Sequence, residues 1–497
     1  MRRPARLLLL LLGAVAASAF LFAWARPYDP EPWLADFAAL EAGADAAFAN
    51  LEWHVTHGID PVALHRRTDS LIRHAGSDRE ARAALRAFAA AFHDGHFAVV
   101  RPMPTWISSL RDHWRGSSDA PPTATMSGED ACAAIGYVDD AAEPSLLIRA
   151  VGYRALAAGT FEAGVIATEG QMAIGVIRIG TFGVDRFRAA CASAWPRVRD
   201  SLAHPTCDEE CQSEMRLSTG NVLLADLRRA IDAVRAAGAT ALVVDLTGNG
   251  GGTEWADPAA RQFSARPLMG QELGFVRHPH WRAALDSDAR AIDSTLADAS
   301  TDASLRPPLA SARAALDTAL REIEKPCVRA ALWHEGHAAV SCRQLVTGRL
   351  FTTGAVPYLE AGLRKLRGAS LLFWPSAYDF EEGAWHGPLA ILVDQRTASA
   401  SEQFAALLRD AGSAVVVGAH TYGAGCGMTN GGIPLTLPYS GLEVRMPDCA
   451  RLRTDGTNEV AGITPDLNAH WSDDDDDVAR AAKAAVALQR VFAASSP

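Results

Sequence analysis

The chain lacks an excess of basic charge, and this bears directly on its partners. Its 497 residues include 58 Asp and Glu against 47 Lys and Arg, a formal net charge of −11. Because proteins bind nucleic acids through basic residues that neutralise phosphates, this balance argues against a nucleic-acid partner. The content of 49% hydrophobic and 21% charged residues is ordinary for a globular protein, and the length allows two to four domains.

Several ligand-binding patterns are also missing. The glycine-rich stretch from Thr247 to Gly252 does not match the pattern G-x-x-x-x-G-K-[ST] of a phosphate-binding loop. The histidines of the His334–His337 segment lie closer together than those of the zinc-binding pattern H-E-x-x-H. A zinc site that combines these histidines with Cys327 and Cys342 is a weaker alternative. The prediction for the chain is no metal and no cofactor.

A single long apolar run stands at the start of the chain. It extends from Leu7 to Ala25 and follows the basic stretch Met1–Arg6. A basic start followed by an apolar stretch and small residues is typical of an export signal, and the run also approaches the roughly 20 residues of a membrane-spanning helix. Residues 1–25 are therefore expected to be a cleaved signal peptide or a retained anchor that attaches the protein to a membrane. We expect an exported protein of the periplasm or cell envelope.

Export favours disulfides for the eight cysteines, an even number. The apolar segments 433–437 and 442–446 are expected to form a hairpin, and one pair of cysteines flanks it, so that the two residues could face each other across it. The expected pairs are Cys426 with Cys449, Cys207 with Cys211, Cys327 with Cys342, and Cys132 with Cys191.

The pattern of apolar residues divides the remaining chain into segments of different character. Residues 26–96 have helical periodicity, which predicts a helical N-terminal domain. Residues 97–170 mix short apolar segments with Pro and Gly and are expected to be a small mixed β segment. Residues 171–255 and 376–497 are expected to form the two parts of one core, which ends in a C-terminal helix. Between them lies a predicted, mostly helical insertion at 256–375.

Strands and helices alternate in the expected core. Such alternation predicts a parallel sheet covered by helices, an α/β fold. A further strand is expected at 145–151, and helices of the insertion at 281–299 and 308–324. The core elements expected in chain order are a strand at 174–179, helices at 184–201 and 219–237, strands at 241–246 and 389–394, a helix at 402–410 and a strand at 414–418.

The strand expected at 241–246 runs directly into the glycine-rich loop Thr247–Gly252. Its glycines let the backbone turn sharply and bring N–H groups close to a ligand. Such a loop could act as an oxyanion hole, and a plain glycine turn is the alternative.

The turn Thr397–Glu402 follows another apolar strand and opens a helix. A turn of small residues at this place can present one hydroxyl at a helix N-terminus, where backbone N–H groups favour developing negative charge. The turn therefore suits a nucleophilic serine. Simple capping of the helix by Ser and Thr is the alternative.

Together these segments resemble the S41 peptidases, the family of the carboxy-terminal processing proteases and the tricorn-like proteases. The resemblance implies a ClpP- and crotonase-like ββα-superhelix core. Many processing proteases carry a PDZ module before this core, but residues 97–170 show no clear PDZ pattern. The matching pieces are the strand 174–179 with Phe182, the segment 244–252, the turn 397–402, the segment 417–423 and the segment 462–466.

The family motifs assign the candidate nucleophile and base. The nucleophile of the family is the first serine of S-A-S-E, which is Ser399 here. The processing proteases take their base from a lysine in T-[FY]-G-K-G, but this chain has Ala424 at that position, so a Ser–Lys dyad is excluded. The tricorn-like branch uses a histidine in a D-G-H-like segment, which matches His96. A neutral imidazole is a competent base for a serine hydroxyl.

The resemblance also implies the remaining members of the site. In the histidine-using branch a carboxylate that orients the imidazole lies shortly before the G-[IV]-x-P-D segment, and Glu459 matches it. Asp455 and Asp94 are the competing carboxylates.

The implied oxyanion donors are the N–H groups of Gly250 or Gly251 together with that of Ala400. The chain is therefore expected to be an exported serine endopeptidase that cleaves peptide or protein substrates through an acyl-enzyme on Ser399. The alternative is a catalytically inactive relative that binds peptide or a small apolar ligand in the same cleft.

Overall fold

The computed structural model describes most of the chain and allows the fold to be followed from residue 27 onward. Among the residues that the structure describes, no helix combines the length and the apolar content needed to cross a membrane. The apolar N-terminal segment, Cys327 and Cys342 lie outside them, so the predictions on those residues stay predictions. The described residues are 27–102, 121–139, 143–157, 159–167, 172–202, 204, 206–325, 332–335, 343–429 and 432–494.

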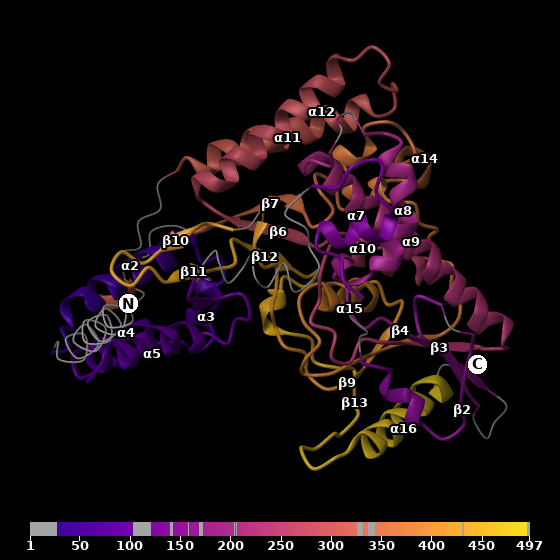
Figure 1. Cartoon of the computed structure of the whole chain (residues 1–497), viewed down its shortest axis with the longest axis horizontal. Coiled ribbons are helices and arrows are strands. Elements are labelled where there is room, and N and C mark those ends of the chain that lie inside the picture. The colour runs from indigo at the N-terminus through magenta and orange to yellow at the C-terminus, as the bar shows by residue number, and fades with distance from the viewer. Residues whose placement is uncertain are drawn as a thin grey trace, which may run out of the picture.

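The core is a seven-stranded sheet in which strands distant in the sequence lie side by side (Figure 1). Its strands are β2 (Tyr153–Ala155), β3 (Ala163–Ala167), β4 (Ala173–Arg178), β5 (Ala241–Asp245), β8 (Leu389–Val393), β9 (Val415–Gly418) and β13 (Leu467–Asn468). They lie in the order β13-β9-β8-β5-β4-β3-β2, parallel from β13 to β4 and antiparallel for the last two pairs. Every residue of β5 and β8 is buried, as expected of parallel strands covered on both faces.

Helices cover both faces of this sheet (Figure 1). One face packs against a group of helices through buried residues such as Leu227 and Phe404, and the other packs against α16 through Leu488 and Phe492. The predicted alternation is thereby confirmed, although the second helix begins before its expected start. The helices of the first face are α7 (Gly128–Ala134), α8 (Arg188–Arg199), α9 (Glu209–Ala236), α10 (Ala256–Gln262) and α15 (Ala400–Asp410), and that of the second is α16 (Asp477–Ala494).

The strand predicted at 145–151 was wrong. The segment Leu146–Arg149 forms a 3₁₀ helix. Ser145 explains the difference, because its hydroxyl accepts the N–H of Leu147 at 3.1 Å and donates to Asp245 at 2.6 Å. A local cap of this kind competes with strand pairing for the backbone.

The N-terminal helices pack against the C-terminal part of the chain. They are α2 (Glu31–Ala47), α3 (Leu51–Thr56), α4 (Pro61–Arg73) and α5 (Asp78–Ala90). Their buried cluster includes Phe88 and Phe92 together with Leu442 from the predicted hairpin. The short strands beside them, in the order β1-β11-β10, are β1 (Ala98–Val100), β11 (Glu443–Arg445) and β10 (Leu435–Thr436). Figure 1 shows the indigo N-terminal helices beside the hairpin formed by β10 and β11. Because β1 pairs with β11, the residues just before β1 lie near the C-terminal part of the chain.

The predicted insertion contains strands as well as helices. Its two long helices, α11 (Pro279–Ala297) and α12 (Arg306–Ile323), confirm the expected pair and project together from the molecule (Figure 1). The insertion also contributes β6 (Glu272–Val276) and β7 (Leu345–Phe351), and β6 pairs with β12 (Cys449–Leu452). It is therefore joined to the C-terminal part by a sheet. The remaining short elements are η2 (Val184–Arg186), α13 (Leu332–Glu335), α14 (Ala361–Arg364), η4 (Ala369–Leu371), η5 (Trp374–Ala377) and η7 (Glu459–Ala461).

Three of the predicted disulfides are present. Each joins cysteines that the fold brings together, in one case only four positions apart in the sequence. Stable disulfides are typical of oxidising compartments outside the cytosol. The pairs are Cys132–Cys191, Cys207–Cys211 and Cys426–Cys449.

Candidate active site

Ser399 occupies the turn between β8 and α15, directly before the first residue of the helix. Its backbone has a φ of 57°, a left-handed conformation that is uncommon for a residue with a side chain. Such outliers persist only where the surrounding structure enforces them, and they cluster at functional sites. The predicted strand, turn and helix around Ser399 are confirmed.

The glycine-rich loop lies directly against this turn. Since β5 and β8 are neighbouring parallel strands, the loops that follow them leave the sheet at the same edge. The N–H of Ala398 donates to the carbonyl of Asn249 at 3.0 Å. A Cβ on Gly251 would lie 2.8 Å from the Cβ of Ser399 and 2.9 Å from the nitrogen of Ala400. Only glycine allows this approach, which explains the glycine at position 251.

The candidate oxyanion donors differ in their availability. The N–H of Gly251 already donates to the side chain of Asn249 at 2.9 Å. In the part of the chain that the structure describes, the N–H groups of Gly250 and Ala400 have no protein acceptor. A Cβ on Gly250 would meet no atom within 4 Å, so open space adjoins this residue. Of the two glycines proposed, Gly250 has the free donor.

Glu402 is a site residue that the sequence analysis treated only as part of the family motif. Its carboxylate is fully buried and accepts the N–H of Ser399 at 2.9 Å. It also accepts the hydroxyl of Thr421 at 2.5 Å and the N–H groups of Gly423 at 2.8 Å and Ala424 at 2.9 Å. Burial raises the pKa of Glu402, and the hydrogen bonds partly offset this effect. Glu402 thus ties the serine turn to the loop that contains Ala424.

His96 approaches the same loop from the N-terminal region. Its Nδ1 lies 2.7 Å from the carbonyl oxygen of Ala424. Because a carbonyl can only accept, a neutral imidazole must hold its proton on Nδ1 to form this bond, and the lone pair of Nε2 is then free. On its other side the ring is close to Gly427, where an added Cβ would lie 3.2 Å from Nε2 and Cε1.

A buried polar network connects the turn before His96 with the loop that contains Glu459. Asp94 accepts the N–H of His96 and the side-chain amide of Asn50, each at 2.9 Å. The side-chain oxygen of Asn50 accepts the amide of Asn458 at 2.8 Å. Asn50 is fully buried between α2 and α3. Asp94, a competing carboxylate in the sequence analysis, therefore organises the backbone at His96.

Glu459 is fully buried, and in the described chain none of its hydrogen bonds goes to His96. One oxygen accepts the side-chain amide of Gln271 at 2.8 Å, and the other pairs with the guanidinium of Arg451. Arg451 in turn donates to the carbonyl oxygens of Ser399 at 2.9 Å and Gly425 at 2.6 Å. Glu459 is thus linked to the nucleophile turn through Arg451, a residue that sequence motifs did not reveal.

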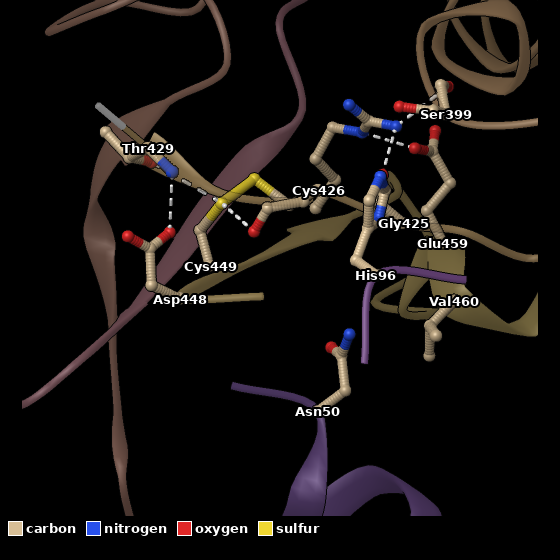
Figure 2. The surroundings of a disulfide bond; sticks show 12 residues. Asn50, His96, Ser399, Gly425, Cys426, Thr429, Asp448, Cys449, Glu459 and Val460 are labelled. Carbon is tan, nitrogen blue, oxygen red and sulfur yellow. Dashed lines mark hydrogen bonds and ion pairs between the residues drawn. A yellow bond between two sulfur atoms is a disulfide. The ribbon is translucent and has the colours of Figure 1, made fainter. Parts of the chain in front are cut away.

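The predicted catalytic residues therefore lie in one region, but within the described residues no continuous chain of hydrogen bonds between their side chains links the serine, the histidine and the glutamate. Figure 2 shows His96 on a segment in the colour of the N-terminal region, near Gly425, Glu459 and Ser399. No hydrogen bond joins His96 to Ser399 or to Glu459 within the described ranges. The third competing carboxylate, Asp455, is exposed and accepts the N–H of Thr457.

Metal binding finds no support in the part of the chain described. No group of three or more His, Cys, Asp or Glu side chains there is arranged to hold an ion. His334 is described, but Cys327, His337 and Cys342 of the alternative zinc site lie outside the described residues.

Comparison with protein families identifies the second part of the core. A model described as peptidase family S41 matches residues 338–469. This region belongs to the S41 peptidases. The match includes Ser399, Ala424 and Glu459, and it confirms the predicted family together with its enzyme class, a serine-type peptidase. His96 lies outside the matched residues.

Solved structures of similar fold extend over nearly the whole chain. The structure of mature CPAF complexed with lactacystin shares 12% identity, covers 94% of this chain and 98% of that chain, and gives a TM-score of 0.55. Mature CPAF shares 13% identity, with 94% and 99% covered and the same TM-score of 0.55. At this level of identity the likeness shows the fold alone, and it confirms the α/β class with a helical N-terminal region. No curated protein matches the chain.

Proposed function

We propose that the protein is an exported serine endopeptidase that hydrolyses peptide bonds through an acyl-enzyme on Ser399. The observation that supports this most directly is the position of His96. A histidine from the N-terminal region is held with its free Nε2 beside the loop that Glu402 ties to Ser399. A strained serine at a helix N-terminus, a free imidazole nitrogen and free backbone donors are the groups that acyl transfer needs.

In the proposed reaction, the hydroxyl of Ser399 attacks the scissile carbonyl and gives its proton to Nε2 of His96. The hydrogen bond from Nδ1 to Ala424 favours the tautomer that can accept this proton. The imidazolium then protonates the leaving amine. Water, activated by the same nitrogen, releases the acyl group and restores the serine.

The N–H groups of Gly250 and Ala400 are assigned as the donors that stabilise the negatively charged oxygen of the tetrahedral intermediate. Both are free in the described chain, and that of Ala400 lies at the start of α15. Donors fixed before the reaction stabilise a developing oxyanion without the cost of reorganisation. The N–H of Gly251 could join them only by giving up its bond to Asn249.

Glu459 is proposed as the acidic member of the site. Its bonds to Gln271 and Arg451 place its charge near Ser399, and contact with the imidazole would require His96 to exchange its acceptor Ala424. Catalytic hydrogen bonds are often long or absent in free enzymes and tighten with substrate. Replacement of Glu459 by Gln should therefore slow acylation less than loss of His96.

An inactive relative that binds peptide or a small apolar ligand is the competing function. The absence of a direct bond between Ser399 and His96 in the described chain suits this alternative as well. The two functions differ in the reactivity of the serine, because only an activated hydroxyl attacks a fluorophosphonate.

The test is covalent labelling of the purified, disulfide-intact protein with a fluorophosphonate. Labelling should occur at Ser399, disappear in Ser399→Ala and fall strongly in His96→Ala. An unlabelled wild type, under conditions that label a control serine protease, would leave the binding function as the explanation. Sequencing the mature N-terminus by mass spectrometry tests export by signal cleavage separately.

A further inference from the structure

The segment Ala424–Gly427, here called the His96 cradle, surrounds the proposed base on two sides. The carbonyl of Ala424 binds Nδ1 of the imidazole at 2.7 Å. Gly427 approaches the ring so closely, with a φ of 88°, that any side chain there would press against Nε2 and Cε1. The orientation of His96 therefore depends on where this segment lies.

The cradle has no helix or strand to hold it, since none of its residues is part of a regular element. Its position depends on tethers. The N–H of Ala424 donates to Glu402, and the carbonyl of Gly425 accepts from Arg451. Between these contacts and Gly427 stands Cys426, which is bonded to Cys449.

Cys449 is a firm anchor for this loop. It is the first residue of β12, whose register with β6 aligns Cys449 with Phe275, and it is buried. Arg451 lies two residues further along the same strand. The disulfide and the guanidinium of Arg451 therefore fasten the cradle to one strand. Figure 2 shows the disulfide together with Gly425 and His96.

We propose that the Cys426–Cys449 disulfide is a positioning element for the general base. It acts by keeping the cradle, and with it the carbonyl of Ala424, where the Nδ1 proton of His96 is bound. This inference rests on the proposed function, since it assigns the disulfide a part in catalysis beyond its part in folding.

A purely structural disulfide is the alternative, and the chain provides a matched control. Cys132–Cys191 joins α7 to α8, two helices to which none of the candidate site residues belongs. It spans 59 residues against 23 for Cys426–Cys449. Because the constraint on the unfolded chain grows with loop length, loss of the control disulfide should lower the free energy of unfolding at least as much.

The experiment measures the rate of fluorophosphonate labelling in two double variants whose folding is checked by circular dichroism. Cys426→Ser with Cys449→Ser should be labelled about 100-fold more slowly than wild type, in line with the cost of a small misplacement of a catalytic group. Cys132→Ser with Cys191→Ser should keep the wild-type rate. Equal rates for wild type and the Cys426 and Cys449 variant would overturn the proposal, and so would equal losses in both variants.

A second measurement shows whether the disulfide acts through His96. In the His96→Ala background, removal of Cys426 and Cys449 should cause almost no further loss, because residues that work as one unit have non-additive effects. Multiplicative losses would contradict the inference. A wild type that is not labelled at all would instead overturn the proposed function, and this inference with it.

Gly427→Ala serves if the disulfide variant does not fold. It keeps the disulfide but places a methyl group 3.2 Å from the imidazole. Gly238→Ala is its control, because Gly238 has the same φ of 88° and no atom within 4 Å of the added Cβ. Slow labelling of the Gly427 variant alone supports positioning by the cradle, and equal rates for the two variants contradict it.

Discussion

Arg451 and Glu459 form a buried ion pair next to the candidate nucleophile, and the guanidinium also holds the carbonyl oxygen of Ser399 at 2.9 Å. Their side chains are 7% and 0% exposed. A buried pair of this kind contributes little relative to a well-packed apolar pair, but it becomes costly when one partner is removed. The relationship makes Arg451 both a structural residue and a neighbour of the chemistry.

Arg451→Met should therefore lower the free energy of unfolding by about 3–5 kcal/mol, because it leaves the carboxylate of Glu459 buried without its cation. Chemical denaturation measures this difference. Arg409→Met is the control, since Arg409 pairs with Asp466 near the surface and exposed pairs contribute about 1 kcal/mol or less. Similar losses in the two variants would show that Glu459 does not depend on Arg451.

Asn50→Ala should weaken the connection between the His96 turn and the Glu459 loop. The buried side chains of Asp94 and Asn458 would each lose a partner, at a cost of about 1–3 kcal/mol in the free energy of unfolding. We also expect slower labelling of Ser399, because the turn at His96 loses a support.

Asn221→Ala provides the comparison for Asn50→Ala, as the side chain of Asn221 accepts one hydrogen bond near the surface in the described chain, from the N–H of Asp379. Its stability and labelling rate should stay close to wild type. If Asn50→Ala lost stability but kept the wild-type labelling rate, the network would support the fold without positioning His96.

Glu402→Gln should change how stability depends on pH. Burial raises the pKa of Glu402 in the folded protein above its value in the unfolded chain. The stabilising contribution of such a group is fully present below the unfolded value, about 4.3, and is lost as the pH rises through the folded value. Denaturation at several pH values should show the advantage of wild type over the variant shrinking as the pH rises, and an advantage that grew with pH would contradict the raised pKa.

The same substitution should destabilise the protein even where the titration contributes little. Each oxygen of Glu402 accepts two hydrogen bonds from N–H or O–H donors. In Gln an NH₂ group replaces one of these oxygens, so that a donor would face two other donors. Loss of these bonds should cost about 1–3 kcal/mol in the free energy of unfolding.

A histidine base predicts a characteristic pH profile for peptidase activity. Activity should be lost when the pH is lowered far enough to protonate the base, because an imidazolium has no lone pair to accept the proton of Ser399. The measurement is the rate of acylation against pH for wild type, compared with the residual rate of His96→Ala. A profile governed only by a group near pH 9 would indicate an amine base instead.

Local sequence patterns determined much of the fold. Continuous apolar runs predicted β5 and β8 because buried parallel strands need apolar residues on both faces. The small-residue turn at Ser399 was predictable because a strand, a turn and a helix adjoin within a few residues. The strand predicted at 145–151 was wrong, because the hydrogen bond of Ser145 to Asp245 is a tertiary contact that the apolar residues of this segment do not predict.

The relationships within the site were decided by tertiary structure. Motifs named Ser399, His96 and Glu459 one by one, but only the fold shows that Nδ1 of His96 binds a carbonyl and that Glu459 pairs with Arg451. Asn50 carried no sequence signal, because an asparagine after a helix is usual in any turn. A motif specifies residue types over a short stretch of sequence. These hydrogen bonds, in contrast, join atoms from distant segments and form only when the N-terminal helices, β12 and the glycine-rich loop pack together.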